Sequence, residues 1–399
     1  MLLQTSNKEL KRRNEKAKRI LSEKDLEGFC LFSPTYIFYF TGFSFIATER
    51  PIALLFNSEK DVMELVVPAL EKDHVEDLPS FIQAESYPEY PGKNHPMNFV
   101  KKRINDLGLD KKSACLGIDS DGYAGGYGYK GPSLSETLDH SEVENIKETL
   151  DKTMMVKSPE EIEMIKESAR WGNLAHRLLQ EYSAPGMIET EISERASFEA
   201  SMAMIKTLGE DYSLTKYGSR PASANFRGQI GSKSAIPHAI TTNAKLKEGD
   251  ILITGASSEV GGYISELERT MVLGKPTAKQ EKYFNLIVEL QDLALDTIEP
   301  GIPCSKVDEV VRKFYKDKGI WEHWRHHVGH ALGYRMHEAP FFDLGDETII
   351  EPGMVFSVEP GIFIPGFAGF RHSDTVLVTE DGIEYITYYP RDLESLTID

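Results

Sequence analysis

The alternation of apolar and polar positions divides the chain into two parts of different character. In the first part, short apolar runs bounded by turn residues predict buried strands over 29–32, 52–56, 63–67 and 114–118. A Lys/Glu-rich stretch predicts a helix over 7–24, and the Gly/Tyr-rich stretch 121–131 indicates a loop. Helices and strands thus alternate through the first 155 residues.

After about residue 155 the pattern predicts longer amphipathic helices with strands between them. Ser158 has the position of a helix cap and Pro159 that of a first helical residue, in a helix expected to end near Tyr182. Further helices are predicted over 188–206, 278–298 and 305–317, the last beginning with a capping-box pattern at Ser305. Strands are predicted near 250–254, 263–272, 354–363 and 374–380. We therefore predict two domains, 1–155 and 156–399.

Composition excludes several classes of function. The 399-residue chain has a formal net charge of −18, which argues against binding to nucleic acid or to an anionic membrane. It has no apolar run approaching the roughly 18 residues of a membrane span, and no signal-peptide pattern at its start. The three cysteines, Cys30, Cys115 and Cys304, are far apart and odd in number, which argues against a disulfide framework or a thiolate metal site. These features favour a cytoplasmic protein.

The densest group of chemically active residues lies around His330. His326, His327, His330 and His337 fall within twelve residues among glycines, and an apolar strand containing Glu359 follows. Imidazole and carboxylate groups in this arrangement predict a metal site or an acid–base site.

A pair of glutamates gives a second indication. Glu266 and Glu268 are two positions apart, so on a strand both side chains point to the same face. Buried like charges are unfavourable unless a cation neutralises them. That cation is a metal, an arginine such as Arg371, or a cationic substrate. Glu359 needs a cation for the same reason.

Several motifs resemble one known family. The His330 run, the Pro352–Gly361 run with Glu359, and Gly369-Phe370-Arg371 resemble the catalytic domain of the creatinase/prolidase/methionine aminopeptidase family. Residues 33–36 and 39–43 resemble its creatinase-type N-terminal domain. The resemblance implies an α/β N-terminal domain, an α+β pita-bread catalytic domain over 156–399, and a homodimer.

The resemblance also implies where metal ligands lie. The five ligand positions of the family's dinuclear peptidases fall on Gly255, Glu266, His330, Glu359 and Ser373. Two of these residues cannot act as family ligands, so the expected site holds a single Mn, Fe or Zn ion on Glu266, His330 and Glu359. Asp374 and Glu268 are candidates for a further ligand. His238, His337 and Arg371 match family residues that act on the substrate.

Three functions remain open from the sequence. The leading hypothesis is a hydrolase of amide-type C–N bonds, with a dipeptide substrate of Xaa-Pro type and catalytic residues His238, His337, Glu359 and Arg371. The second is a metal-free enzyme similar to creatinase or ectoine hydrolase, in which glutamates including Glu268 hold a small cationic substrate and Arg50 reaches it from a partner subunit. The third is an inactive homologue that binds peptides.

Overall fold

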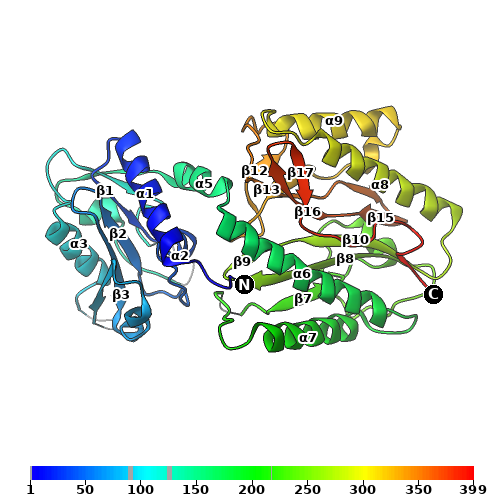
Figure 1. The fold of residues 1–399 in the computed structure, drawn as a ribbon, viewed down its shortest axis with the longest axis horizontal. Helices are drawn as coiled ribbons and strands as arrows, with labels where there is room; N and C mark the ends of the chain where they lie inside the picture. Colours follow the sequence, from blue (N-terminus) through cyan, green and yellow to red (C-terminus); the bar gives the residue numbers. More distant parts are fainter. Residues whose placement is uncertain (1, 89–92, 124–127, 217) are drawn as a thin grey trace. The chain divides into compact units, whose positions relative to one another are not determined.

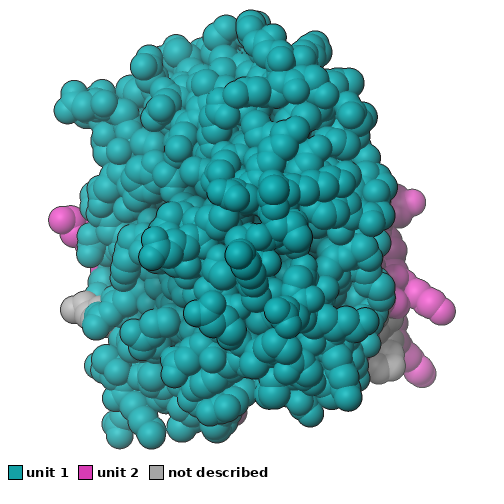
Figure 2. All heavy atoms as spheres, turned by 90° about the vertical axis from the view of Figure 1, so that its right-hand side faces the viewer, with its two compact units in different colours: residues 1–4, 155–214, 218–399 teal, residues 5–154, 215–217 magenta. Residues whose placement is uncertain are grey.

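The computed structural model describes residues 2–88, 93–123, 128–216 and 218–399. The chain forms two compact units, which Figure 2 colours separately. The N-terminal unit comprises residues 5–154 and 215–217, and the C-terminal unit comprises 1–4, 155–214 and 218–399.

The N-terminal unit is built on a six-stranded sheet of order β4-β3-β2-β1-β5-β6. The β1–β2 and β2–β3 pairs are antiparallel and the other neighbours are parallel. Helices α1 and α3 lie on opposite faces of this sheet (Figure 1). Its strands are β1 (Gly28–Leu31), β2 (Ala53–Asn57), β3 (Val62–Pro68), β4 (Ile82–Tyr87), β5 (Cys115–Ile118) and β6 (Glu142–Asn145). Its helices are α1 (Asn7–Glu23), α2 (Pro34–Thr41), α3 (Pro96–Leu107), α4 (Leu134–Thr137) and α5 (Lys147–Met155).

All four strands predicted in this unit are present, and most of their observed ends differ from the predicted ones by one residue. The helix predicted over 7–24 is α1. The described part of the predicted loop 121–131 has no helix or strand, and residues 124–127 lie outside the described residues. The aromatic stretch after Ser33 forms the short helix α2, which buries Tyr36, Tyr39 and Phe40. Burial of these rings explains why this stretch is so rich in aromatic residues.

The C-terminal unit combines two larger sheets and a hairpin with two helix pairs. One sheet has the order β18-β10-β8-β7 with β9 on β8, the other β12-β11-β13-β16-β17, and β14 pairs with β15. Helices α6 and α7 lie along the first sheet, and α8 and α9 pair with each other (Figure 1). The helices are α6 (Pro159–Tyr182), α7 (Glu189–Leu208), α8 (Ala278–Thr297) and α9 (Cys304–Asp317).

The strands of this unit are short except at its centre. They are β7 (Ala222–Asn225), β8 (Ile251–Val260), β9 (Tyr263–Ile264), β10 (Leu267–Leu273), β11 (Gly329–Ala331), β12 (Glu338–Phe342), β13 (Val355–Val358), β14 (Gly361–Ile364), β15 (Ala368–Arg371), β16 (Asp374–Thr379), β17 (Gly382–Tyr385) and β18 (Thr397–Ile398). The predicted strand 354–363 is in fact two, because Glu359 and Pro360 separate β13 from β14. That break places Glu359 at a strand end, where its side chain is free to enter a site.

The predicted helix starts are right in one case and wrong in another. Ser158 caps α6 in a full capping box with Glu161, and the helix ends at Tyr182 as predicted. Ser305 is not a cap: α9 begins at Cys304 after Pro303, without a side-chain cap bond. The acidic member of that predicted box, Asp308, is buried and instead accepts a hydrogen bond from Arg312 at 2.7 Å.

Two buried histidines predict that the C-terminal unit loses stability in mild acid. Burial, and secondarily the charge of Arg269, lowers the pKa of His176 to about 3 and the pKa of His372 well below its usual value. Both are therefore neutral in the folded chain, whereas an unfolded histidine gains a proton below about pH 6.5. The contribution of each histidine to the free energy of unfolding is fully present above about pH 6.5. It decreases as pH falls below that value, by about 1.4 kcal/mol per pH unit for each residue.

Urea unfolding between about pH 6.5 and pH 5 measures this slope. His372→Leu should reduce the slope by about 1.4 kcal/mol per pH unit, because it removes one buried neutral histidine. His140→Gln, which changes an exposed histidine, should leave the slope unchanged. A His372→Leu slope equal to that of the wild type would show that His372 is not buried in its neutral form.

Within the described residues, no helix is both long and apolar enough to span a membrane.

Candidate functional site

Three residues distant in sequence meet in the C-terminal unit. Glu266, His330 and Glu359 are all buried, and one ligand atom of each lies within 4.8 Å of the others. His330 Nε2 is 3.3 Å from Glu359 Oε1 and 3.6 Å from Glu266 Oε2. The sequence prediction named these three residues as a metal site, and the structure brings them together.

The strands fix each of these side chains. His330 is the middle residue of β11, which pairs with β12 on one side and β13 on the other. Glu359 follows β13 directly, and its N–H donates to the carbonyl of Val328 at 2.7 Å. Glu266 precedes β10, and its N–H donates to Thr375 Oγ1 at 2.9 Å. All three backbones are thus hydrogen-bonded, so the side chains converge without local flexibility.

The carboxylates and the imidazole strongly affect each other's protonation. Burial, together with the charges of Glu359 and Glu268, raises the pKa of Glu266 to about 8. Burial opposes ionisation of His330, but contact with Glu359 and the charge of Glu266 outweigh it and raise its pKa to about 9. Burial likewise opposes ionisation of Glu359, but His330 and Arg371 outweigh it and hold its pKa well below the usual value. Perturbation of this size is typical of functional sites.

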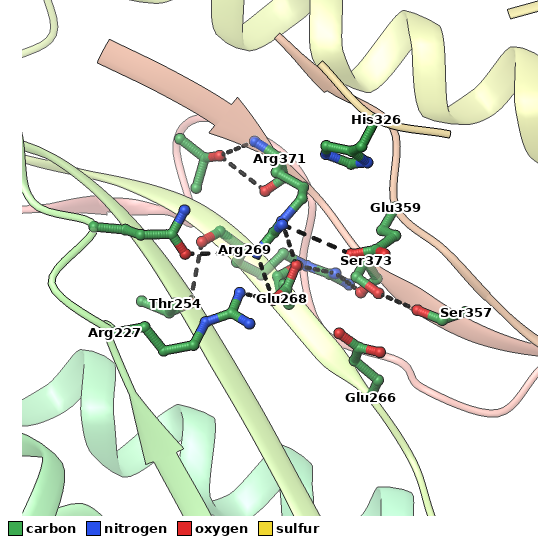
Figure 3. A network of polar contacts seen from close by, with 12 residues as sticks. Arg227, Thr254, Glu266, Glu268, Arg269, His326, Ser357, Glu359, Arg371 and Ser373 are labelled. Carbon is green, nitrogen blue, oxygen red and sulfur yellow. Dashed lines mark hydrogen bonds and ion pairs between the residues drawn. The ribbon is translucent and has the colours of Figure 1, made fainter. Parts of the chain in front are cut away.

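The other glutamate of the pair, Glu268, is neutralised by two arginines. Arg371 makes a forked ion pair with it, with Nε 2.5 Å from Oε2 and Nη2 2.7 Å from Oε1. Arg227 contacts the same Oε1. Figure 3 shows the two guanidinium groups reaching Glu268 from different sides. Of the cations considered from the sequence for this pair, the structure therefore has an arginine at Glu268.

Sequence reasoning missed Arg227 altogether. It lies in a turn after β7, where neither strand alternation nor helix periodicity marks a side chain as facing a site. The available signal is Gly228, shortly after the end of β7, because glycine marks turns. His326, one of the four histidines around His330, also lies near the site: it helps to lower the pKa of Glu359, and Figure 3 shows its ring beside Arg371 and Glu359.

The two predicted substrate histidines lie at the edge of the site and are exposed. The ring of His337 stacks on that of His330 with a centroid distance of 3.8 Å. Burial, the charge of His330 and, more weakly, that of His238 lower the pKa of His337. The neutral imidazole of His337, stacked on His330 of the buried cluster, is suited to hydrogen-bond a substrate. Arg50 belongs to the N-terminal unit and pairs with Glu49 at 2.6 Å, so its role stays a prediction.

Two residues expected near the metal do not act as ligands in this arrangement. The Oδ1 atom of Asp374 accepts from Arg269 and its Oδ2 atom accepts from Gln291, so this carboxylate faces away from the three-residue cluster. The prediction that Asp374 is a candidate for a further metal ligand was therefore wrong. Ser373 Oγ pairs with Ser357 Oγ at 2.7 Å. Strand alternation between 373 and 374 explains why only one of the two can face the site.

The three-residue cluster fits a divalent cation. His330 Nε2 and Glu266 Oε2 are buried and have no hydrogen-bond partner among the residues described. Metal bonds of roughly 2.1 Å place neighbouring ligand atoms roughly 3 to 3.5 Å apart, close to the 3.3 and 3.6 Å separations here. His330 Nδ1 donates to the Ala331 carbonyl at 3.1 Å, which leaves Nε2 as the ligand atom. One imidazole and two carboxylates suit Mn, Fe or Zn.

The metal affinity of this cluster should rise with pH. Without a cation, His330 with a pKa of about 9 and Glu266 with a pKa of about 8 carry protons at neutral pH. A metal must displace both protons, so affinity increases up to about tenfold per pH unit for each proton, until pH exceeds about 9. Calorimetric Mn²⁺ titrations from about pH 6.5 to pH 9 test this. An affinity independent of pH would mean that the cation binds elsewhere.

Comparisons with known proteins agree with the resemblance. The model described as metallopeptidase family M24 matches residues 163–380, and that of the creatinase/prolidase N-terminal domain matches residues 13–156. An Xaa-Pro dipeptidase of Pyrococcus furiosus is 26% identical, with 96% of this chain and 100% of the relative covered.

Solved structures share the whole fold. A prolidase of Thermococcus sibiricus matches with a TM-score of 0.80 at 25% identity, covering 96% of this chain and 98% of the other. The N-terminal domain of a FACT complex subunit from chickpea matches with a TM-score of 0.70 at 14% identity, covering 98% of this chain and 97% of the other. Because a FACT complex subunit shares the fold with peptidases, function must be argued from the side chains of the site.

Proposed function

Because the chain belongs to metallopeptidase family M24, we propose that it hydrolyses dipeptides of Xaa-Pro type with a single divalent cation held by Glu266, His330 and Glu359. The observation that carries the proposal is the buried cluster itself, whose three ligand atoms lie within 4.8 Å of one another. The relatives named Xaa-Pro dipeptidase and prolidase support the substrate class.

The side chains around the cluster support this chemistry. A bound divalent cation lowers the pKa of a water molecule and polarises a carbonyl group. Glu266 and Glu359 supply the negative charge that holds the cation, and the Ala331 carbonyl keeps the His330 ring in the correct orientation. His337 and His238 donate hydrogen bonds to the substrate carbonyl as negative charge develops on it. Arg371, 3.8 Å from Glu359, keeps that carboxylate ionised and in place.

The charge around Glu268 supports one cation rather than two. Arg371 and Arg227 already neutralise this carboxylate. Gly255, its neighbour on β8, has no side chain to offer, and Ser373 on its other side has a neutral hydroxyl. A second divalent cation beside two guanidinium groups would be repelled.

The two alternative functions are not favoured. A metal-free enzyme that holds a cationic substrate requires a free carboxylate at Glu268, but this group is already in ion pairs with two arginines. The family match and the peptidase relatives support a hydrolase rather than an inactive peptide-binding protein.

Substrate assays test the proposed function. Purified protein loaded with Mn²⁺ or Zn²⁺ should cleave Xaa-Pro dipeptides, and a chelator should abolish the cleavage. Creatine and ectoine should not be substrates. Chelator-resistant hydrolysis of either compound, without cleavage of Xaa-Pro dipeptides, would overturn the proposal in favour of the metal-free enzyme.

We further propose that the protein is a cytoplasmic homodimer, as the family resemblance implies. Cys30, Cys115 and Cys304 are free thiols, which is consistent with a reducing compartment. Light scattering coupled to size-exclusion chromatography measures the assembly directly.

A further inference from the structure

We propose that Arg227 binds the carboxylate of the substrate in a pocket beside the metal-ligand cluster; the inference rests on the proposed function for the identity of that substrate. The pocket has a volume of about 150 Å³. Its lining includes Glu266 of the cluster and Glu268, together with Ser223, Asn225, Arg227 and Gly255. A ligand in this pocket therefore lies against one of the candidate metal ligands.

The backbone that carries Arg227 is strained. Gln229 N–H donates to the carbonyl of Phe226 at 2.8 Å and closes a four-residue turn. The central residues Arg227 and Gly228 have φ of 51° and 71°, the left-handed values of a type I′ turn. For a residue with a side chain this conformation costs about 1 to 2 kcal/mol. An arginine kept in such a position indicates that its side chain is required there.

The buried side chain of Glu189 holds this turn in place. Glu189 accepts hydrogen bonds from the N–H groups of Gly228 at 3.0 Å, Thr242 at 2.7 Å and Ala244 at 3.3 Å. A Cβ atom at position 228 would lie 2.2 Å from the carbonyl oxygen of Ile240, so only glycine fits there. The backbone that carries the guanidinium group of Arg227 is thus fixed beside the pocket. This reduces the conformational entropy that is lost when a ligand binds.

The charges at the site sum to one positive charge in excess. Glu268 carries one negative charge, whereas its two ion-pair partners, Arg371 and Arg227, carry two positive charges. A divalent cation on Glu266 and Glu359 neutralises those two carboxylates. The charge of Arg227 then remains in excess, and a substrate carboxylate would balance it.

Arg227 is also the accessible member of the arginine pair. Its side chain is 40% exposed, against 3% for Arg371. Within the described parts of the chain, its ion pair uses only Nη2, on Glu268. The Nε and Nη1 donors remain for a ligand, and a guanidinium group matches the two oxygens of a carboxylate.

Gly255 leaves room for a ligand in the pocket, and Asn225 can form a hydrogen bond with it. Gly255 faces Glu268 on one side and Asn225 on the other, and a Cβ there would lie 3.6 Å from Glu268 Oε1. A larger side chain at 255 would therefore fill the pocket. Asn225 Oδ1 is buried and lacks a hydrogen-bond partner among the described residues, so it can accept a bond from a ligand N–H.

Kinetics of the metal-loaded enzyme separate a binding role from a structural one. Arg227→Gln should raise KM for an Xaa-Pro dipeptide by about 10- to 100-fold, the effect of one charge-assisted contact, and change kcat little. KM for the corresponding Xaa-prolinamide should not change, because this substrate lacks the carboxylate. Arg227→Lys should restore part of the loss. Arg220→Gln, at an exposed arginine paired with Glu194 of the same unit, is the matched control.

Calorimetry with proline and prolinamide keeps the two proposals distinguishable. The metal-loaded wild type and Arg220→Gln should bind proline more tightly than prolinamide, and Arg227→Gln should lose this preference. Equal proline binding by Arg227→Gln and the wild type, or no proline binding by the wild type, overturns the role of Arg227. Failure to cleave any Xaa-Pro dipeptide, with the proline preference intact, overturns the proposed function alone.

Discussion

His330→Ala should abolish cation binding and lower kcat/KM by on the order of 10³-fold or more, because it removes several kcal/mol of electrostatic stabilisation of the transition state. The substitution removes the only nitrogen ligand of the cluster and leaves two carboxylates that repel each other. Loss of one of three protein ligands reduces the affinity for a divalent cation far more than the 10- to 100-fold cost of losing a supporting contact.

A thermal-unfolding measurement with and without Mn²⁺ provides a readout independent of activity. A cation that binds only the folded state raises the melting temperature of the wild type, and it should leave that of His330→Ala unchanged. His323→Ala is the control, since this residue lies outside the metal-ligand cluster. Retention of the Mn²⁺-dependent shift in His330→Ala would show that His330 is not a ligand.

Arg269→Met should lower the free energy of unfolding of the C-terminal unit by about 3 to 5 kcal/mol, the cost of breaking a buried ion pair from one side. The guanidinium group of Arg269 is fully buried, and all five of its N–H donors are used. Nη2 donates to Asp374 Oδ1 at 2.8 Å. The other bonds go to the carbonyl oxygens of Glu268, Ser373, Tyr389 and Pro390. Methionine leaves a buried carboxylate without its cation and removes four hydrogen bonds to carbonyl oxygens, although those of Glu268 and Ser373 keep a backbone N–H donor.

Urea unfolding of Arg269→Met and of the double variant Arg269→Met/Asp374→Leu measures this effect. The double variant should be less destabilised than the single one, because it removes the unpaired carboxylate as well. Arg170→Met, at a 55% exposed arginine 3.8 Å from Glu167, should change stability by less than about 0.5 kcal/mol. A loss below about 1 kcal/mol in Arg269→Met would mean that water replaces the arginine, contrary to its complete burial.

The three residues of the metal-ligand cluster could be predicted from the sequence. Burial of Glu266 and Glu359 without a partner is costly, so a cation could be expected at each. That the two carboxylates share this cation with His330 followed only from the resemblance to the family. The helices of the C-terminal unit could also be predicted, since Ser158 and Pro159 specify where α6 begins regardless of tertiary contacts.

The parts that were missed depend on contacts between distant segments. Arg227 reaches Glu268 from an irregular turn whose position is set by Glu189, and nothing near 227 in the sequence indicates that pairing. Asp374 has a carboxylate group that could bind a metal, but the partners of this group are Arg269 and Gln291. Ser305 fits a capping pattern, yet Asp308 Oδ2 accepts hydrogen bonds from the distant Leu344 N–H and from Arg312. In each case tertiary packing overrides the local pattern.

A titration of Mn²⁺ into metal-free protein, followed by the rate of Xaa-Pro dipeptide cleavage, tests most directly the claim that one cation on Glu266, His330 and Glu359 supports hydrolysis. We expect no cleavage without metal and a rise in rate that stops at about one equivalent per chain. Cleavage that persists without metal, or a rate that rises until about two equivalents are bound, would contradict it.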